Sequence, residues 1–201
     1  MHRPSMYTRP NKPLIIEVKD RKEPSKIAPV EIVEPVIVDK ATECHVTPDD
    51  VAERMVEYLG EQGDYLTLEP SAGTGQLVKA LLASGHSDCE LTAVERHFTL
   101  ANQVSRLCPT ITSCFLEYAE KWRGVAEFPR VIMNPPFKSV KKHVAAALSL
   151  MGRGGHDRPA VLVALVPITF KWEGMEELEI LPSDTFSTAK VHTKIIRIEV
   201  E

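Results

Sequence analysis

Residues 65–84 read YLTLEPSAGTGQLVKALLAS, and this stretch decides the fold. The run Tyr65–Glu69 predicts a short strand, and the turn after it contains Gly73 and Gly75. Apolar residues at helical spacing then predict a helix from Gln76 to about Ser84. A strand, a tight glycine turn and a helix in this order are typical of a sheet whose strands run parallel.

The same alternation of strands and helices continues along the chain. We predict a helix that starts at Thr47-Pro48, with Thr47 as its cap, and that stops near Gly60. A further helix is predicted from the end of the second strand to about Leu107, and another over Val140–Met151. The predicted strands after the first are Glu90–Val94, Ile111–Phe115, Arg130–Met133 and Ala160–Val166, followed by a hairpin of Leu178–Leu181 and Val191–Val200. The fold class is therefore α/β: a mostly parallel sheet with a C-terminal antiparallel hairpin and helices on both faces.

The N-terminal part differs from the rest of the chain. Residues 1–38 hold six of the fifteen prolines and show no long period. We predict an irregular arm with short extended pieces at Leu14–Val18 and Val30–Val38, and one domain over residues 39–201. Such an arm is a disordered tail, an edge strand laid on the domain, or a basic segment that contacts nucleic acid.

Composition places the chain among soluble globular proteins. Hydrophobic residues make up 43 % and charged residues 26 % of its 201 residues, and no apolar run is long enough to span a bilayer. We expect no export signal, a cytoplasmic location and reduced thiols. The four cysteines form no Cys-x-x-Cys pair, which argues against a zinc site. The net charge of −4 gives no global signature of a nucleic-acid binder, although a local basic face can still bind one.

Three unusual segments fall at predicted strand ends: Glu69–Gly75, Glu95 and Asn134–Phe137. Ligands of parallel sheets bind at the carboxyl ends of the strands, so these segments are expected to share one site. The turn with Gly73 and Gly75 lets the backbone approach a ligand closely, but it is neither a complete dinucleotide fingerprint nor a phosphate loop. Glu95, about 20 residues beyond that turn, can accept both ribose hydroxyls of an adenosine or can be an ordinary solvated glutamate.

The segment Asn134-Pro135-Pro136-Phe137 is the sharpest feature of the chain. Two prolines fix the backbone just after a strand and remove two donors, so the Asn134 and Pro135 carbonyls and the Asn134 side chain become acceptors. An amino group that donates two hydrogen bonds to these acceptors keeps its lone pair directed at an electrophile. Phe137 offers a flat face on which a planar base can stack. The alternative is a rigid strand-to-helix turn with a buried Phe.

From about His45 onwards the chain resembles the amino-methyltransferases with an Asn-Pro-Pro-Phe/Tyr motif, chiefly the DNA adenine-N6 methyltransferases. The resemblance implies a Rossmann-like class I methyltransferase fold and S-adenosylmethionine as cofactor. It implies that Asn134, Pro135, Pro136 and Phe137 are catalytic. It implies that the cofactor is bound by Thr47 at its methionine part, by the loop from Glu69 through Gly73 to Gly75, and by Glu95 at its ribose.

One part of the resemblance is incomplete. The family usually places an Asp after its third strand to hold the adenine of the cofactor, and here Cys114 stands at that position, followed by Phe115. On the substrate side, Phe186 matches the loop before the last strand pair, where an aromatic residue packs beside a flipped base. The cluster of Lys138, Lys141, Lys142 and His143 is either a solvated helix face or a contact with substrate phosphate, and we expect Lys138 to bind substrate.

The predicted activity is therefore methyl transfer to the N6 amino group of adenine in DNA. The adenine would be flipped out of the duplex to reach the site. The chain has no separate target-recognition domain, so we expect low sequence specificity or a partner subunit, as suits a small phage or prophage enzyme. A cytosine-C5 enzyme is disfavoured because its nucleophilic Pro-Cys is reversed here, as Cys108-Pro109. The alternatives are an RNA or protein-glutamine amino-methyltransferase, and a degenerate module that binds nucleic acid or a partner without chemistry.

Overall fold

The fold was obtained as a computed structural model that describes residues 46–186 and 191–201. The predicted arm over residues 1–38, with its extended pieces Leu14–Val18 and Val30–Val38, lies outside the described residues, as does the predicted domain boundary at residue 39.

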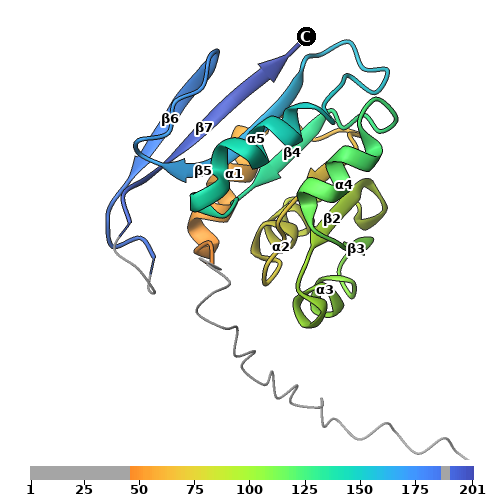
Figure 1. The fold of residues 1–201 in the computed structure, drawn as a ribbon, viewed down its shortest axis with the longest axis horizontal. Coiled ribbons are helices and arrows are strands. Elements are labelled where there is room, and N and C mark those ends of the chain that lie inside the picture. Colours follow the sequence, from red (N-terminus) through yellow and green to blue (C-terminus); the bar gives the residue numbers. More distant parts are fainter. Residues whose placement is uncertain (1–45, 187–190) are drawn as a thin grey trace, which may run out of the picture. The chain divides into compact units, whose positions relative to one another are not determined.

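The described residues form a seven-stranded sheet in the order β3-β2-β1-β4-β5-β7-β6. The first five strands in this order pair in parallel, whereas β7 pairs antiparallel with both β5 and β6 (Figure 1). The predicted mostly parallel sheet with a C-terminal antiparallel hairpin is therefore confirmed. The strands are β1 (Thr67–Glu69), β2 (Leu91–Glu95), β3 (Thr110–Thr112), β4 (Arg130–Met133), β5 (Ala160–Pro167), β6 (Met175–Leu181) and β7 (Thr193–Val200).

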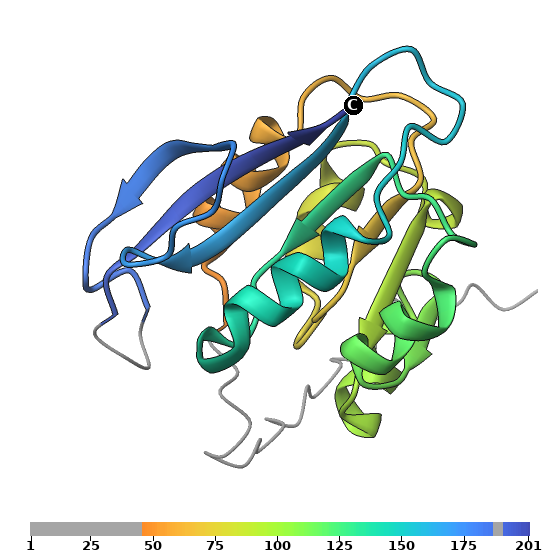
Figure 2. The ribbon, with the colours of Figure 1, turned by 45° about the horizontal axis from the view of Figure 1, so that its top comes forward.

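Helices cover both faces of the sheet (Figure 2). One core lies beneath α1 (Asp49–Tyr58), α2 (Gln76–Ala83) and α3 (Phe98–Val104), and the other beneath α4 (Phe115–Trp122) and α5 (Val140–Leu148). The residues of β5 alternate between these cores: Val161 and Val163 belong to the first, and Leu162 and Ala164 to the second. This period of two explains why the continuous apolar run of β5 is buried on both faces. The described residues also contain two 3-10 turns, Asp88–Glu90 and Phe137–Ser139.

The third strand and the helix after it differ from the sequence prediction. We predicted a strand over Ile111–Phe115, but β3 ends at Thr112 and Phe115 begins α4. β3 lies at one edge of the sheet, where it pairs with β2 over three residues and where Ile111 and Thr112 are exposed. Phe115, Tyr118 and Ala119 are buried at helical spacing, so this apolar pattern belongs to a helix that the prediction missed.

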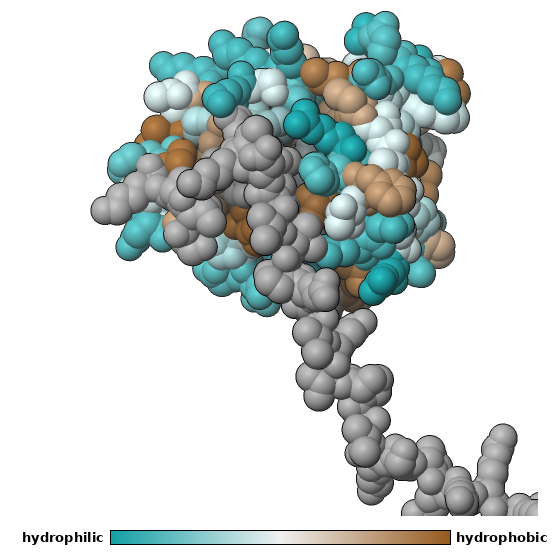
Figure 3. Space-filling model, turned by 60° about the horizontal axis from the view of Figure 1, so that its bottom comes forward, coloured by the Kyte–Doolittle hydropathy of each residue, from teal (hydrophilic) through white to brown (hydrophobic). Residues whose placement is uncertain are grey.

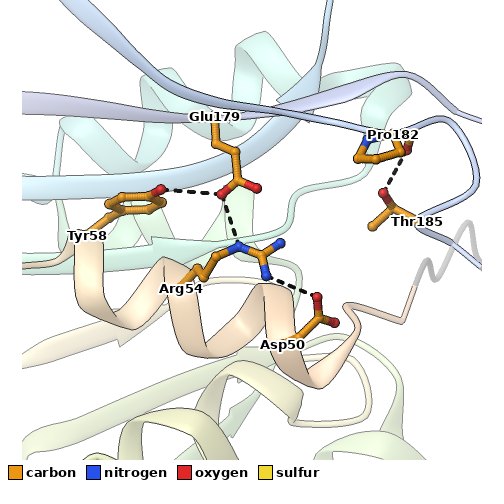
Figure 4. Close-up of polar contacts among 6 residues, drawn as sticks. All are labelled: Asp50, Arg54, Tyr58, Glu179, Pro182 and Thr185. Atoms are coloured by element: carbon orange, nitrogen blue, oxygen red, sulfur yellow. Dashed lines mark hydrogen bonds and ion pairs between the residues drawn. The ribbon is translucent and has the colours of Figure 1, made fainter.

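A polar cluster fixes α1 against the antiparallel end of the sheet (Figure 4). The Arg54 Nε donates a hydrogen bond of 3.0 Å to the Glu179 carboxylate on β6, and the Tyr58 hydroxyl donates to the same oxygen at 3.3 Å. Arg54 also forms an ion pair with Asp50 one turn earlier. Just after β6, a turn closed by the Thr185 hydroxyl on the Pro182 carbonyl leads the chain to Phe186. The contacts of Arg54 and Tyr58 hold the second half of α1 beside β6.

We predict that Gly75→Ala lowers the free energy of unfolding by more than Gly60→Ala does. Both glycines have positive φ, +80° and +100°, so each alanine costs about 1–2 kcal/mol of backbone strain. At Gly75 an added Cβ would also lie 3.2 Å from the Val104 side chain of α3, whereas at Gly60 it would meet nothing within 4 Å. Urea unfolding of both variants measures the difference. Equal losses would show that the N-terminus of α2 is not tightly packed against α3.

Candidate active site

A cavity of about 390 Å³ lies at the carboxyl ends of the parallel strands. Its size falls within the range of small-molecule sites, about 300–1,000 Å³. Loops from β1, β2, β3 and β4 all contribute to its walls. The cavity brings together most of the predicted site residues: Thr47, Glu69, Gly73, Glu95, Cys114, Phe115, Asn134, Pro135, Pro136 and Lys138.

Figure 3 views the molecule from the side on which α3 lies. Over the coloured part of this face, hydrophilic and hydrophobic residues are interspersed, without a single broad apolar area.

Three predicted residues do not line the cavity. Gly75 is the N-cap of α2. Its left-handed backbone forms the turn before this helix, and its lack of a side chain allows close packing on α3. Phe137, the last residue of the motif, begins the 3-10 turn Phe137–Ser139 and is half-buried. Its ring meets Phe186 edge to face, with ring centroids 6.5 Å apart, and Phe186 is buried in the core beneath α1. The two aromatic residues therefore form a pair beside the cavity.

A hydrogen bond joins the motif to the start of the first helix. The Asn134 Nδ2 donates to the Thr47 hydroxyl oxygen at 2.9 Å, across 87 positions of sequence. The prediction that Thr47 caps α1 is therefore wrong: Pro48 occupies the cap position, and no side chain caps this helix. The Thr47 hydroxyl orients the Asn134 amide instead, with the donor end of the amide directed at Thr47.

Glu95 is held in place by the backbone around it. One carboxylate oxygen accepts the Gly73 N–H at 2.8 Å, and the other accepts the His97 N–H at 2.7 Å. Gly73 presents its N–H from a backbone with φ of +54°, which favours glycine. The glycine turn and the carboxylate are thus one unit, fixed before any ligand binds. A carboxylate has about four acceptor sites, so capacity remains for ligand hydroxyls.

Glu69 is a buried carboxylate without a full set of partners. It ends β1 with 3 % of its surface exposed, and its Oε2 has no hydrogen-bond partner among the described residues. Burial and the nearby Glu95 carboxylate raise the pKa of Glu69 well above its usual range, and a backbone hydrogen bond from Val78 opposes this only in part. A buried carboxyl group that faces a cavity with one oxygen lacking a hydrogen-bond partner favours a ligand with positive charge.

His143 is a site residue that the sequence prediction misplaced. We grouped it with Lys138, Lys141 and Lys142 as a solvated helix face or a phosphate contact. The three lysines are exposed, but His143 is buried and lines the cavity, with its ring 5.9 Å from that of Phe115. Its spacing from Val140 and Ala147 matches the buried side of α5, so helical periodicity was the signal that could have found it.

No family model and no curated protein sequence matches the chain. Solved structures do match. The methyltransferase subunit of a type I restriction-modification system from Streptococcus thermophilus aligns with a TM-score of 0.62 at 14 % identity, over 78 % of this chain and 45 % of that one. YhhF from Escherichia coli, a proposed methyltransferase, aligns with a TM-score of 0.59 at 14 % identity, over 77 % and 88 %. A proposed RNA methyltransferase from Pyrococcus horikoshii aligns with a TM-score of 0.56 at 17 % identity, over 78 % and 88 %.

These similarities and the strand order establish the fold. The chain has the Rossmann-like class I methyltransferase fold, as predicted. Within residues 46–186 and 191–201, no group of His, Cys, Asp and Glu side chains could hold a metal ion. No helix in the same ranges has the length and apolar character needed to cross a membrane.

We predict that Glu69→Gln stabilises the protein at pH 7.5 by on the order of 1 kcal/mol, because it removes a carboxyl group whose burial is unfavourable when ionised. Folding raises the pKa of Glu69. The contribution of Glu69 to stability is therefore greatest below pH 4.5, which is the pKa of this residue in the unfolded chain. It is lost as the pH rises through the pKa of Glu69 in the folded protein.

Thermal unfolding of wild type and variant across this pH range measures the effect. Glu173→Gln, at an exposed loop position, serves as the control and should change little. A Glu69→Gln variant that is less stable than wild type at pH 7.5 would contradict the prediction.

Proposed function

We propose that the chain transfers a methyl group from S-adenosylmethionine to the N6 amino group of adenine in DNA. One observation carries this proposal: Asn134, Pro135 and Pro136 line the same cavity as Glu69, Gly73 and Glu95. The acceptors suited to a target amino group and the carboxylates suited to a cofactor thus meet in one site, on a fold shared with methyltransferases.

The cavity residues fit the cofactor. S-adenosylmethionine carries an ammonium group and a sulfonium, and Glu69 supplies a buried carboxyl oxygen that lacks a partner among the described residues. Glu95, already fixed by two backbone N–H groups, would accept the ribose hydroxyls. When bound, the cofactor supplies a methyl group on a positively charged sulfur, which is the electrophile of the reaction.

The Asn134 amide would hold the target nitrogen. Because its Nδ2 donates to Thr47, the carbonyl end of the amide would accept a hydrogen bond from the amino group, and the backbone carbonyl of Pro135 would accept the second. These acceptors would stabilise the positive charge that grows on nitrogen as the N–C bond forms and the C–S bond breaks. Positioning of this kind can lower a barrier by about 7–11 kcal/mol. The proton of the amino group would then leave to water.

The aromatic pair beside the cavity would receive the adenine base. Phe137 is half-buried, and Phe186 supports it edge to face from the core. Stacking on Phe137 would recover about 1–3 kcal/mol of the cost of flipping the base out of the duplex. Lys138, exposed and adjacent, would contact a flanking phosphate.

The first test is transfer of label from tritiated S-adenosylmethionine to unmethylated duplex DNA, followed by nucleoside analysis. Label in N6-methyldeoxyadenosine supports the proposal. Label only in RNA or in glutamine of protein would replace DNA by that substrate. Absence of cofactor binding in calorimetry would leave the non-catalytic binding module as the function.

We predict that Asn134→Ala lowers methylation below detection while the protein stays folded. The variant loses both the side-chain acceptor and the contact with Thr47. Circular dichroism and the thermal midpoint check the fold, and Thr47→Val, which keeps the shape but removes the hydroxyl, should lower the rate less. Normal turnover by Asn134→Ala would rule out the proposed role of this side chain.

We predict that Phe137→Ala also abolishes methylation of duplex DNA. It should bind S-adenosylmethionine with an affinity close to that of wild type, because Phe137 does not line the cavity. Calorimetry with the cofactor and the label-transfer assay separate these two effects. A variant that loses cofactor binding would show that Phe137 acts on the cofactor instead of on the base.

A further inference from the structure

We infer that His143 recognises the adenine base of the cofactor. The Nε2 of His143 accepts a hydrogen bond from the exocyclic amino group of that adenine. The inference rests on the proposed function, because it takes S-adenosylmethionine as the ligand of the cavity. It adds a specificity-determining residue on α5 to a site built mainly from the loops that follow the strands.

The position of His143 in the cavity supports this role. It lies one turn into α5, is 8 % exposed, and lines the cavity together with Ser113, Cys114 and Phe115, which connect β3 to α4. Its ring centroid is 5.9 Å from that of Phe115 at an interplanar angle of 32°. These two rings lie side by side in the cavity wall, where a planar heterocycle would find aromatic surface and a polar nitrogen together.

The hydrogen bonds of His143 determine which ring nitrogen a ligand meets. Nδ1 lies 3.1 Å from the Ser139 carbonyl oxygen and 3.1 Å from the Ser139 hydroxyl. A carbonyl oxygen only accepts, so we assign the proton of the neutral ring to Nδ1, which then donates to this oxygen. In a neutral ring, Nε2 then carries a lone pair and is an acceptor. Burial lowers the pKa of His143 and so favours the neutral ring.

The strand order would direct the base of a bound cofactor toward His143. The methyl-bearing sulfur has to reach Asn134 after β4, and the ribose has to reach Glu95 after β2. The base is attached to the far side of the ribose, so it extends past β2 toward β3, the next strand of the sheet. Ser113–Leu116 and His143 form the wall that it meets there.

Cys114 is a poor substitute for this acceptor. A thiol is a weak acceptor and a weak donor, whereas an imidazole nitrogen accepts strongly. The carboxylate that the resemblance led us to expect after β3 is absent, and the neutral His143 ring supplies an acceptor from a different element at the same end of the cavity.

Calorimetry with two ligands tests the inference. S-adenosylhomocysteine carries the exocyclic amino group, and S-inosylhomocysteine replaces it with an oxygen that would face the Nε2 lone pair. Wild type should bind the amino ligand at least about tenfold more tightly, the effect of one lost hydrogen bond with a polar group left unpaired. In His143→Phe, which keeps a ring of similar shape, the preference should fall below about threefold. Cys114→Ala is the control and should keep the wild-type preference.

The outcomes separate this inference from the proposed function. A preference that persists in His143→Phe, or that is lost in Cys114→Ala, would overturn the role of His143. Wild type that methylates DNA yet binds both ligands equally would overturn it as well, with the proposed function intact. Wild type that binds neither ligand would overturn both.

A second measurement needs no variant. Nitrogen-15 spectra of labelled histidine should show the Nδ1–H form for His143, and its Nε2 signal should shift with S-adenosylhomocysteine but not with S-inosylhomocysteine. An Nε2–H form, or equal shifts with both ligands, would refute the inference.

Discussion

Parallel pairing of β1, β2, β3 and β4 is the constraint on which the site depends. Parallel strands end at the same edge of a sheet, so residues far apart in the sequence meet there without any loop having to bridge them. Glu69, Glu95 and Asn134 each follow or end one of these strands, and all three line one cavity. The strands that bring them together are held by two cores, one on each face, so the positions of the polar groups are set by packing of apolar residues.

The site contains two neighbouring acidic residues, Glu69 and Glu95, whose burial is unfavourable for folding. Glu69 is almost fully buried, its neighbour Glu95 is also acidic, and its Oε2 lacks a partner within the described residues. Glu95 accepts hydrogen bonds from two backbone N–H groups, whereas Glu69 has a backbone hydrogen bond with Val78. Under the proposed function, this difference would give the two carboxyl groups different roles: Glu95 would accept neutral hydroxyl donors, and Glu69 would bind a cation that completes its hydrogen bonds.

The sequence was sufficient for the sheet and for most of the cavity, because both follow from local patterns. The alternating strands, the glycine turn and the Asn-Pro-Pro-Phe motif each carry their information within a few residues. What it missed depends on contacts between distant segments. Thr47 has the chemistry of a helix cap, but its hydroxyl is taken by Asn134, 87 positions away. Phe115 was predicted to end a strand, but it packs with Tyr118 and Ala119 on the buried face of α4, and β3 ends at Thr112.

The antiparallel end of the sheet explains why Phe186 lies beside the motif. Because β7 runs antiparallel to β5 and β6 runs antiparallel to β7, β6 is parallel to β5, and its carboxyl end reaches the same edge as that of β4. The turn from Pro182 to Thr185 then places Phe186 in contact with Phe137. Glu179 on β6 accepts hydrogen bonds from Arg54 and Tyr58 of α1. The reversal of one strand thus divides the edge in two. The parallel half forms the cavity, and the half built on the hairpin supports the aromatic pair of Phe137 and Phe186 beside it.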